Sequence, residues 1–160
     1  MQIPNYNIVI GNQTNVGKVR SLNEDYMEHF ATPLGYCIIV CDGMGGHAAG
    51  DVASQNAIEA IKHFLQNGKI TKLDTALSIH NAIEFANYKL REMVQQNAAL
   101  KGMGTTCVLA LINNADLYIA HAGDSRIYLI RDKEIKQITK DHSVVQNLID
   151  SVLYQKKMQN

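Results

Sequence analysis

The stretch Cys41 to Gly50, CDGMGGHAAG, is the most informative part of this 160-residue chain. An apolar run, residues 36–41, ends at the carboxylate of Asp42, and four glycines then fall within the eight residues 43–50. Short apolar runs of this kind are typical of a buried strand. We therefore expect Asp42 at the end of a rigid element, with backbone groups or a ligand close beside it, because glycine leaves that space open.

Two amphipathic helices are predicted after this stretch. The first covers residues 51–66, with Asp51 as its capping residue and Gly68 just beyond its end. The second has a capping signal at Thr71-x-x-Asp74 and an apolar stripe that runs to about Gln96. Because the connection between them is short, the two helices should pack as an antiparallel pair.

The pattern changes from helix to strand after Gly102-Met103-Gly104. β-Branched and aliphatic residues dominate four segments separated by short turns, namely 105–112, 116–122, 126–131 and 134–139. Short turns join antiparallel neighbours, so these segments should form a meander. Together with the strand at 36–41 and the helix pair, they predict an α+β domain whose sheet carries helices on one face.

Composition limits the classes of protein that fit. Hydrophobic residues make up 46% of the chain and charged residues 19%, which excludes general disorder, and the length suits one domain. The formal net charge of zero provides no broad cationic field for nucleic acid or an anionic membrane. The sequence shows no long apolar segment and no signal peptide, so we expect a cytoplasmic protein. Cys37, Cys41 and Cys107 lie in apolar runs and should be reduced core residues.

The glycine-rich stretch has three interpretations. Gly43-x-Gly45-x-x-Ala48 fits a loose dinucleotide-binding pattern, but Asp42 would repel a pyrophosphate, and the Gly-Lys-Ser/Thr of a P-loop is missing. A plain tight turn is the commonest reason for such a stretch. A site for a hard cation such as Mg²⁺ or Mn²⁺ would use the Asp42 carboxylate and nearby carbonyl oxygens as ligands. The third interpretation requires other segments that converge on Asp42.

Five short motifs in a suitable order favour the cation site. They are Arg20-x-x-Asn23-Glu24-Asp25, Asp42-Gly43-Met44-Gly45-Gly46, Gly104-Thr105-Thr106, Gly123-Asp124-Ser125-Arg126 and Asp141-His142-Ser143. Together they resemble the metal-dependent protein phosphatases of the PP2C (PPM) family in its bacterial form, over about residues 14–150. The resemblance implies an α/β/β/α sandwich of two antiparallel sheets with flanking helix pairs. Residues 1–160 would be a single domain of this type, C-terminally truncated, holding the N-terminal portion with one helix pair.

The resemblance also implies roles for individual residues. Asp42 would bridge two Mn²⁺ or Mg²⁺ ions, and the carbonyl of Gly43 would bind one of them. Glu24 and Asp25 would hold metal-bound waters, and Asp124 would help to bind a possible third ion. Arg20 and Asp42 would be the catalytic residues, and Arg20 and His47 would bind the substrate phosphate.

Each of these residues also has an ordinary structural interpretation. Glu24 and Asp25 suit a solvated surface pair, and Asp124 suits a turn. Asp141-His142-Ser143 suits a structural turn better than a catalytic triad, because adjacent residues cannot act together as nucleophile, base and orienting group.

The expected function is hydrolysis of phosphoserine and phosphothreonine on proteins by a metal-activated water, with phosphorylated proteins and a Ser/Thr kinase or its substrates as partners. No Asp-Gly or Asp-Asn motif follows Asp150, so two metal-binding aspartates of the family and a second helix pair would be missing. Weak metal binding, unpaired sheet edges and uncovered apolar surface should follow. The alternative is a non-catalytic fragment or pseudophosphatase that acts as a phosphoprotein- or partner-binding module. A nucleotide-binding protein is a weaker alternative.

Overall fold

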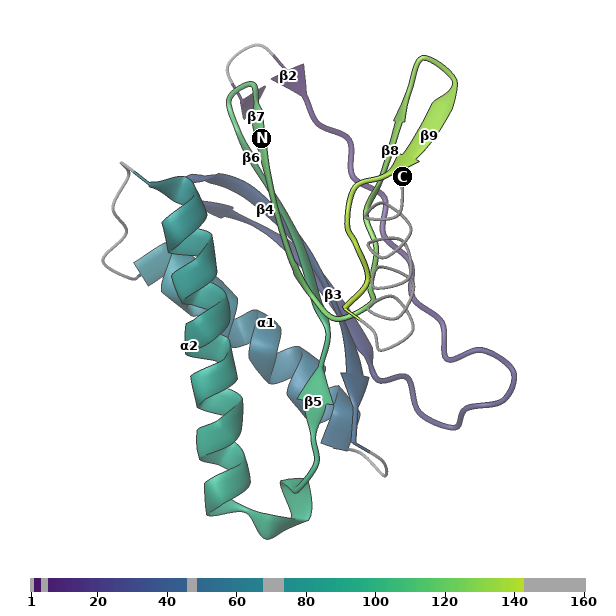
Figure 1. The fold of residues 1–160 in the computed structure, drawn as a ribbon, viewed down its shortest axis with the longest axis vertical. Helices are drawn as coiled ribbons and strands as arrows, with labels where there is room; N and C mark the ends of the chain where they lie inside the picture. The colour runs from purple at the N-terminus through teal and green to yellow at the C-terminus, as the bar shows by residue number, and fades with distance from the viewer. Residues whose placement is uncertain (1, 4–5, 46–48, 68–73, 143–160) are drawn as a thin grey trace, which may run out of the picture.

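The computed structural model describes residues 2–3, 6–45, 49–67 and 74–142. Its centre is a five-stranded antiparallel sheet with the order β3-β4-β6-β7 (Figure 1). The strands are β3 (Asp25–Thr32), β4 (Gly35–Met44), β6 (Cys107–Asn113) and β7 (Asp116–Ala122), and the short β5 (Gly104–Thr105) pairs with the end of β4. The α+β class predicted from the sequence is confirmed.

Two helices cover one face of this sheet (Figure 1). They are α1 (Ala49–Asn67) and α2 (Thr75–Gln96), and they pack against each other as the predicted pair. Side chains from both helices and from alternate positions of β4 and β6 form the buried core, which includes Ile58, Ile61, Leu65, Ile79, Ala82, Cys37, Ile39, Cys41, Cys107, Leu109 and Leu111. The three cysteines are free and buried, as expected. Neither helix is long and apolar enough to cross a bilayer.

The helix boundaries differ from the prediction at the start of α1. This helix begins at Ala49, so Asp51 lies in its first turn and is not the N-cap. The Asp51 carboxylate accepts a hydrogen bond from the amide of Val52, at 2.7 Å. The prediction for α2 is confirmed at Asp74, which is the N-cap and accepts from the amide of Leu77 at 2.8 Å. Thr71 lies outside the described residues.

The strand that carries Asp42 is longer than predicted. It continues through Asp42 to Met44, because β5 supplies a partner, with Gly43 opposite Thr105 and Met44 opposite Gly104. The predicted strand 105–112 is divided at Thr106 into β5 and β6. The strand β7 has the predicted bounds, and the turn before it contains Asn114 with a φ of 54°.

The strand β3 was not predicted from the sequence. Its side chains alternate between the two faces, but apolar residues occur on both, with Tyr26 and Phe30 on the helix side and Met27 on the other. Glu28 lies on the helix side, where it forms an ion pair with Lys62 of α1. Glu28 places a charged residue on the face where the alternating pattern of a strand would have an apolar one. The sequence therefore lacks the apolar–polar alternation that predicts a strand.

A separate two-stranded sheet follows the central one. It consists of β8 (Tyr128–Arg131) and β9 (Glu134–Gln137), each shorter than predicted, and it lies away from the helices (Figure 1). Its turn residues Asp132 and Lys133 both have positive φ, as a tight hairpin turn requires. At the N-terminus, β1 (Gln2–Ile3) pairs with β2 (Tyr6–Asn7).

The second face of the central sheet is partly uncovered. Val40 of β4 and Leu117 of β7 project from this face and are 37% and 52% exposed. Within the described part of the chain, β7 has a strand partner on one side only. The expected unpaired edge and uncovered apolar surface are therefore both observed.

Candidate metal and phosphate site

Asp42 and Asp25 form the centre of the candidate site. They are directly paired across β3 and β4, so both carboxylates project from the sheet face opposite the helices. Directly paired residues have Cβ atoms about 4.5–5.5 Å apart. Desolvation raises the pKa of Asp42, and the nearby charges of Asp25 and Asp124 raise it further, whereas Arg20 lowers it. The structure thus brings these four predicted site residues together.

Glu24 extends the site toward the start of α1. Its Oε2 accepts from Nη1 of Arg20 at 3.3 Å, while its Oε1 is buried and has no hydrogen-bond partner among the described protein atoms. The backbone carbonyl of Glu24 accepts from the amide of Gly43 at 3.1 Å and from the hydroxyl of Ser54 at 2.7 Å. An unpaired buried carboxylate oxygen is costly, so this oxygen suits a water or a cation.

The glycines of CDGMGGHAAG allow helix α1 to begin against strand β4. A Cβ on Gly43 would lie 1.9 Å from the carbonyl oxygen of Gly50, and a Cβ on Gly50 would lie 2.3 Å from Oε1 of Glu24. Such approaches exclude any side chain at either position. Gly43 is therefore required for packing, independently of any ligand that its carbonyl binds.

The backbone of Asp42 is held by Thr105, the last residue of β5, and by Thr106, which separates β5 from β6. The amide of Asp42 donates to Oγ1 of Thr106 at 3.0 Å, and its carbonyl accepts from the amide of Thr106 at 2.9 Å. The same carbonyl accepts from Oγ1 of Thr105 at 3.0 Å. These contacts involve both the amide and the carbonyl of Asp42. They therefore fix the backbone position from which its carboxylate side chain extends.

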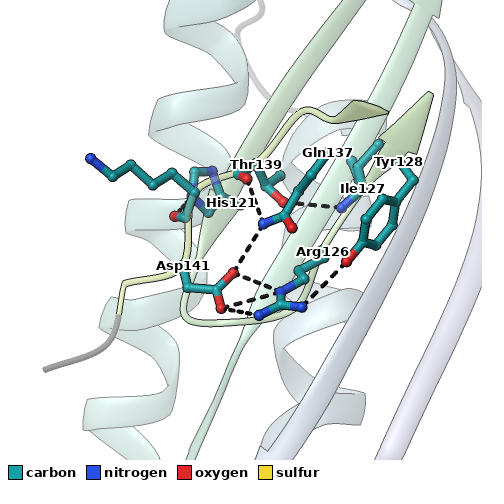
Figure 2. A network of polar contacts seen from close by, with 8 residues as sticks. His121, Arg126, Ile127, Tyr128, Gln137, Thr139 and Asp141 are labelled. Carbon is teal, nitrogen blue, oxygen red and sulfur yellow. Dashed lines mark hydrogen bonds and ion pairs between the residues drawn. The ribbon is translucent and has the colours of Figure 1, made fainter. Parts of the chain in front are cut away.

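The loop that carries Asp124 is anchored by residues 140–142. Arg126 binds Asp141 with two nitrogens, at 2.9 Å from Nε to Oδ1 and 2.6 Å from Nη2 to Oδ2 (Figure 2). The hydrogen bonds and charge of Arg126 hold the pKa of Asp141 below its ordinary value. The amide of His142 donates to the carbonyl of Gly123 at 2.9 Å, and the rings of His142 and His121 lie 4.4 Å apart. Asp141 and His142 therefore have the structural role that the turn interpretation predicted.

His47 lies outside the described residues, so its predicted role in phosphate binding stays a prediction. In the described part of the chain, no group of three or more histidine, cysteine or acidic side chains is close enough together to hold a metal ion. The ligand set of the candidate site is therefore incomplete in this part of the chain, and weak cation binding stays a prediction.

The structure also identifies contacts that the sequence did not reveal. Asn23 accepts from the amide of Asp25 at 3.2 Å and donates to Thr14 at 2.7 Å, which stabilises the turn before β3. Thr106 is also within 2.7 Å of the hydroxyl of Ser125, next to Asp124. The threonine pair in Gly104-Thr105-Thr106 was a visible signal, but its contacts depend on strand pairing.

Comparisons with known proteins identify the family of this chain. The family model described as Protein phosphatase 2C matches residues 24–148, and the chain therefore belongs to that family. Protein phosphatase PhpP of Streptococcus pneumoniae is 42% identical over 142 residues, which is 85% of this chain and 56% of PhpP. The chain spans about half the length of PhpP and of the other curated relatives of similar coverage.

Solved structures show the same fold. The catalytic domain of the serine/threonine phosphatase PstP, crystallised with two manganese ions, is 40% identical and superposes with a TM-score of 0.73, covering 84% of this chain and 56% of PstP's chain. Stp1 from Staphylococcus aureus is 36% identical with a TM-score of 0.78, covering 93% of this chain and 62% of the Stp1 chain. The predicted family and fold class are both confirmed.

Proposed function

We propose that this chain carries the cation- and phosphate-binding part of a protein serine/threonine phosphatase, whose substrates are phosphoproteins modified by a Ser/Thr kinase. The observation that supports this most strongly is the direct pairing of Asp25 with Asp42 across β3 and β4, within reach of the charges of Asp124 and Arg20. Three carboxylates beside one arginine suit a site that binds divalent cations and a phosphate together. Relatives named as serine/threonine phosphatases add support.

The residues present suit Mn²⁺ or Mg²⁺. Mutual repulsion and desolvation disfavour the charged form of Asp42, and a divalent cation would relieve both effects. The unpaired Oε1 of Glu24 would accept from a cation-bound water. We assign Asp42, the Gly43 carbonyl, Asp25, Glu24 and Asp124 to cation binding, two ions being expected and a third possible. When bound, such cations supply Lewis acidity and a water of lowered pKa.

Arg20 is assigned to the substrate phosphate. Its side chain is 75% exposed and contacts Glu24 through one nitrogen, so most of its guanidinium faces solvent. A guanidinium can donate to two phosphate oxygens at once, which orients the ester as well as binding it. In this role Arg20 would hold the phosphate beside the carboxylates. The cytoplasmic location and the single domain over 1–160 stay predictions.

One observation favours the alternative, a non-catalytic module that binds phosphoproteins or a partner. The described part of the chain lacks a complete cluster of metal-ligating side chains. Such a module would bind a phosphothreonine peptide through Arg20 without releasing phosphate.

Phosphate release from a phosphothreonine peptide distinguishes the two functions. Because the ligand set is incomplete in the described part of the chain, we expect only slow release by the 160-residue chain, which requires millimolar Mn²⁺ and is lost on chelation and in Asp42→Ala. Peptide binding without any release, unchanged by Mn²⁺, would favour the non-catalytic module. A chain that neither binds the peptide nor releases phosphate would contradict both assignments.

A further inference from the structure

Thr106 connects strand β4, which carries Asp42, to the loop that carries Asp124. It is 5% exposed and lies where the chain passes from β5 to β6. Its Oγ1 accepts from the amide of Asp42 at 3.0 Å and is 2.7 Å from the hydroxyl of Ser125. One buried hydroxyl therefore contacts the backbone of one candidate ligand and the immediate neighbour of the other.

The methyl group of Thr106 adds a second, apolar contact to the same loop. A Cβ on Gly123 would lie 2.7 Å from Cγ2 of Thr106, so the loop backbone is pressed against this methyl group. Gly123 has a φ of 103°, which a side chain would also disfavour. The shape of Thr106 holds the loop in place, and its hydroxyl sets the register between the loop and Asp42.

We propose that Thr106 and Ser125 are positioning residues that hold the Asp42 strand end and the Asp124 loop in one fixed arrangement, so that both carboxylates act on the same cation-binding site. This inference rests on the proposed function for its consequence in cation binding. The network of Arg126 and Asp141 anchors the other end of the Asp124 loop (Figure 2). Thr106 and Ser125 thus connect the loop that carries Asp124 to Asp42.

The first measurement is residue-level amide hydrogen exchange in the metal-free chain. Thr106→Val keeps the shape but removes the hydroxyl, and we expect exchange at Asp42 and at 123–126 to accelerate by roughly 3- to 10-fold, the effect of losing one hydrogen bond. Ser125→Ala should accelerate exchange at 123–126 only, because the bond from the Asp42 amide remains. Thr106→Ser keeps the hydroxyl but lacks the methyl group, so it should restore the parent exchange rate at Asp42 and leave exchange at 123–126 partly accelerated.

The matched control is Thr32→Val, at the opposite end of the β3–β4 hairpin. Thr32 also loses two hydroxyl hydrogen bonds in this variant, one donated to the carbonyl of Gly35 at 3.0 Å and one accepted from the amide of Leu34 at 3.1 Å. Exchange at Asp42 should not change. Equal exchange rates at Asp42 in Thr106→Val and in the parent would overturn the proposal.

The second measurement is Mn²⁺ affinity by titration calorimetry on the same variants. We expect Thr106→Val to bind roughly 10-fold more weakly, the order of a lost outer-shell contact, with Thr106→Ser and Thr32→Val within about 3-fold of the parent. The double variant Thr106→Val/Ser125→Ala should bind Mn²⁺ no more weakly than Thr106→Val alone, since Thr106→Val already removes the Thr106–Ser125 contact. If the two substitutions weaken Mn²⁺ binding additively, Thr106 and Ser125 do not act through one shared contact, and the proposal is overturned. A parent that binds no Mn²⁺ would contradict the proposed function, and hydrogen exchange alone would then decide the link.

Discussion

Asp25 and Asp42 stand directly opposite each other on β3 and β4, and the charge of Asp25 raises the pKa of Asp42. Like charges at directly paired positions destabilise a sheet. A fold selected for stability alone would place another residue at one of them. The pair is therefore the clearest conflict between stability and site chemistry in this chain, and it suits a site that a cation completes.

Asp42→Asn should stabilise the metal-free chain. The pKa of Asp42 is raised in the folded state, so the folded state binds its proton more tightly than the unfolded state does. The free energy of unfolding therefore falls as pH rises from below 3.8 through the raised pKa, and the variant lacks this loss. We expect Tm at pH 7 to rise by roughly 1–4 °C, as a cross-strand pair allows. Thermal scans with a chelator between pH 3 and pH 7 test this, and a lower Tm in the variant would contradict it.

Gly43→Ala should destabilise the fold, because its Cβ would lie 1.9 Å from the carbonyl oxygen of Gly50. We expect a loss of about 1–3 kcal/mol, the range for an overpacked interior, measured by urea unfolding. Gly11→Ala is the control, since a Cβ there meets nothing within 4 Å. Equal unfolding midpoints for the two variants would show that the start of α1 does not pack on β4 as described.

Asp141→Asn should weaken the fold in a pH-dependent manner. Arg126 lowers the pKa of Asp141 below its ordinary 3.8, so the carboxylate contributes stability that is present above that value and is lost as pH falls through the folded-state pKa. The difference in Tm between parent and variant should be largest near neutral pH and disappear in strong acid. Asp116→Asn, an exposed position on β7, provides the control. A difference that persists at low pH would exclude the ion pair as its cause.

Arg20→Ala should weaken phosphate binding more than cation binding. Loss of a charged hydrogen-bonding partner predicts roughly 10- to 100-fold weaker binding of inorganic phosphate in the presence of Mn²⁺. Mn²⁺ affinity itself should change by less than about 3-fold. Calorimetric titration of both ions tests this, with Arg131→Ala, at the exposed end of β8, as the control. If phosphate binds Arg20→Ala and the parent equally well, Arg20 is not its ligand.

The sequence predicted those elements whose signals are local. The bounds of β7 follow from β-branched and aliphatic residues between short turns, and the cap of α2 follows from Asp74. The strand β3 was missed because Glu28 depends on Lys62, which is 34 residues away. The extension of β4 depends on pairing with β5, which local patterns do not encode.

The candidate site was predictable in its residue types but not in its supporting contacts. The order of the motifs indicated Asp42, Asp25, Asp124 and Arg20, and the structure brings them together. The link through Thr106 joins residues 64 and 19 positions apart, so only the folded sheet reveals it. The sequence also did not show that Gly43 is required for packing against Gly50.

Calorimetric titration with Mn²⁺ tests most directly whether the carboxylates around Asp42 form a cation site. We predict a saturable binding signal for the 160-residue chain that is lost in Asp42→Ala and retained in Asp116→Ala, an exposed aspartate on the same sheet. Circular dichroism would confirm that both variants stay folded. Equal Mn²⁺ binding by the parent and by folded Asp42→Ala would contradict the assignment.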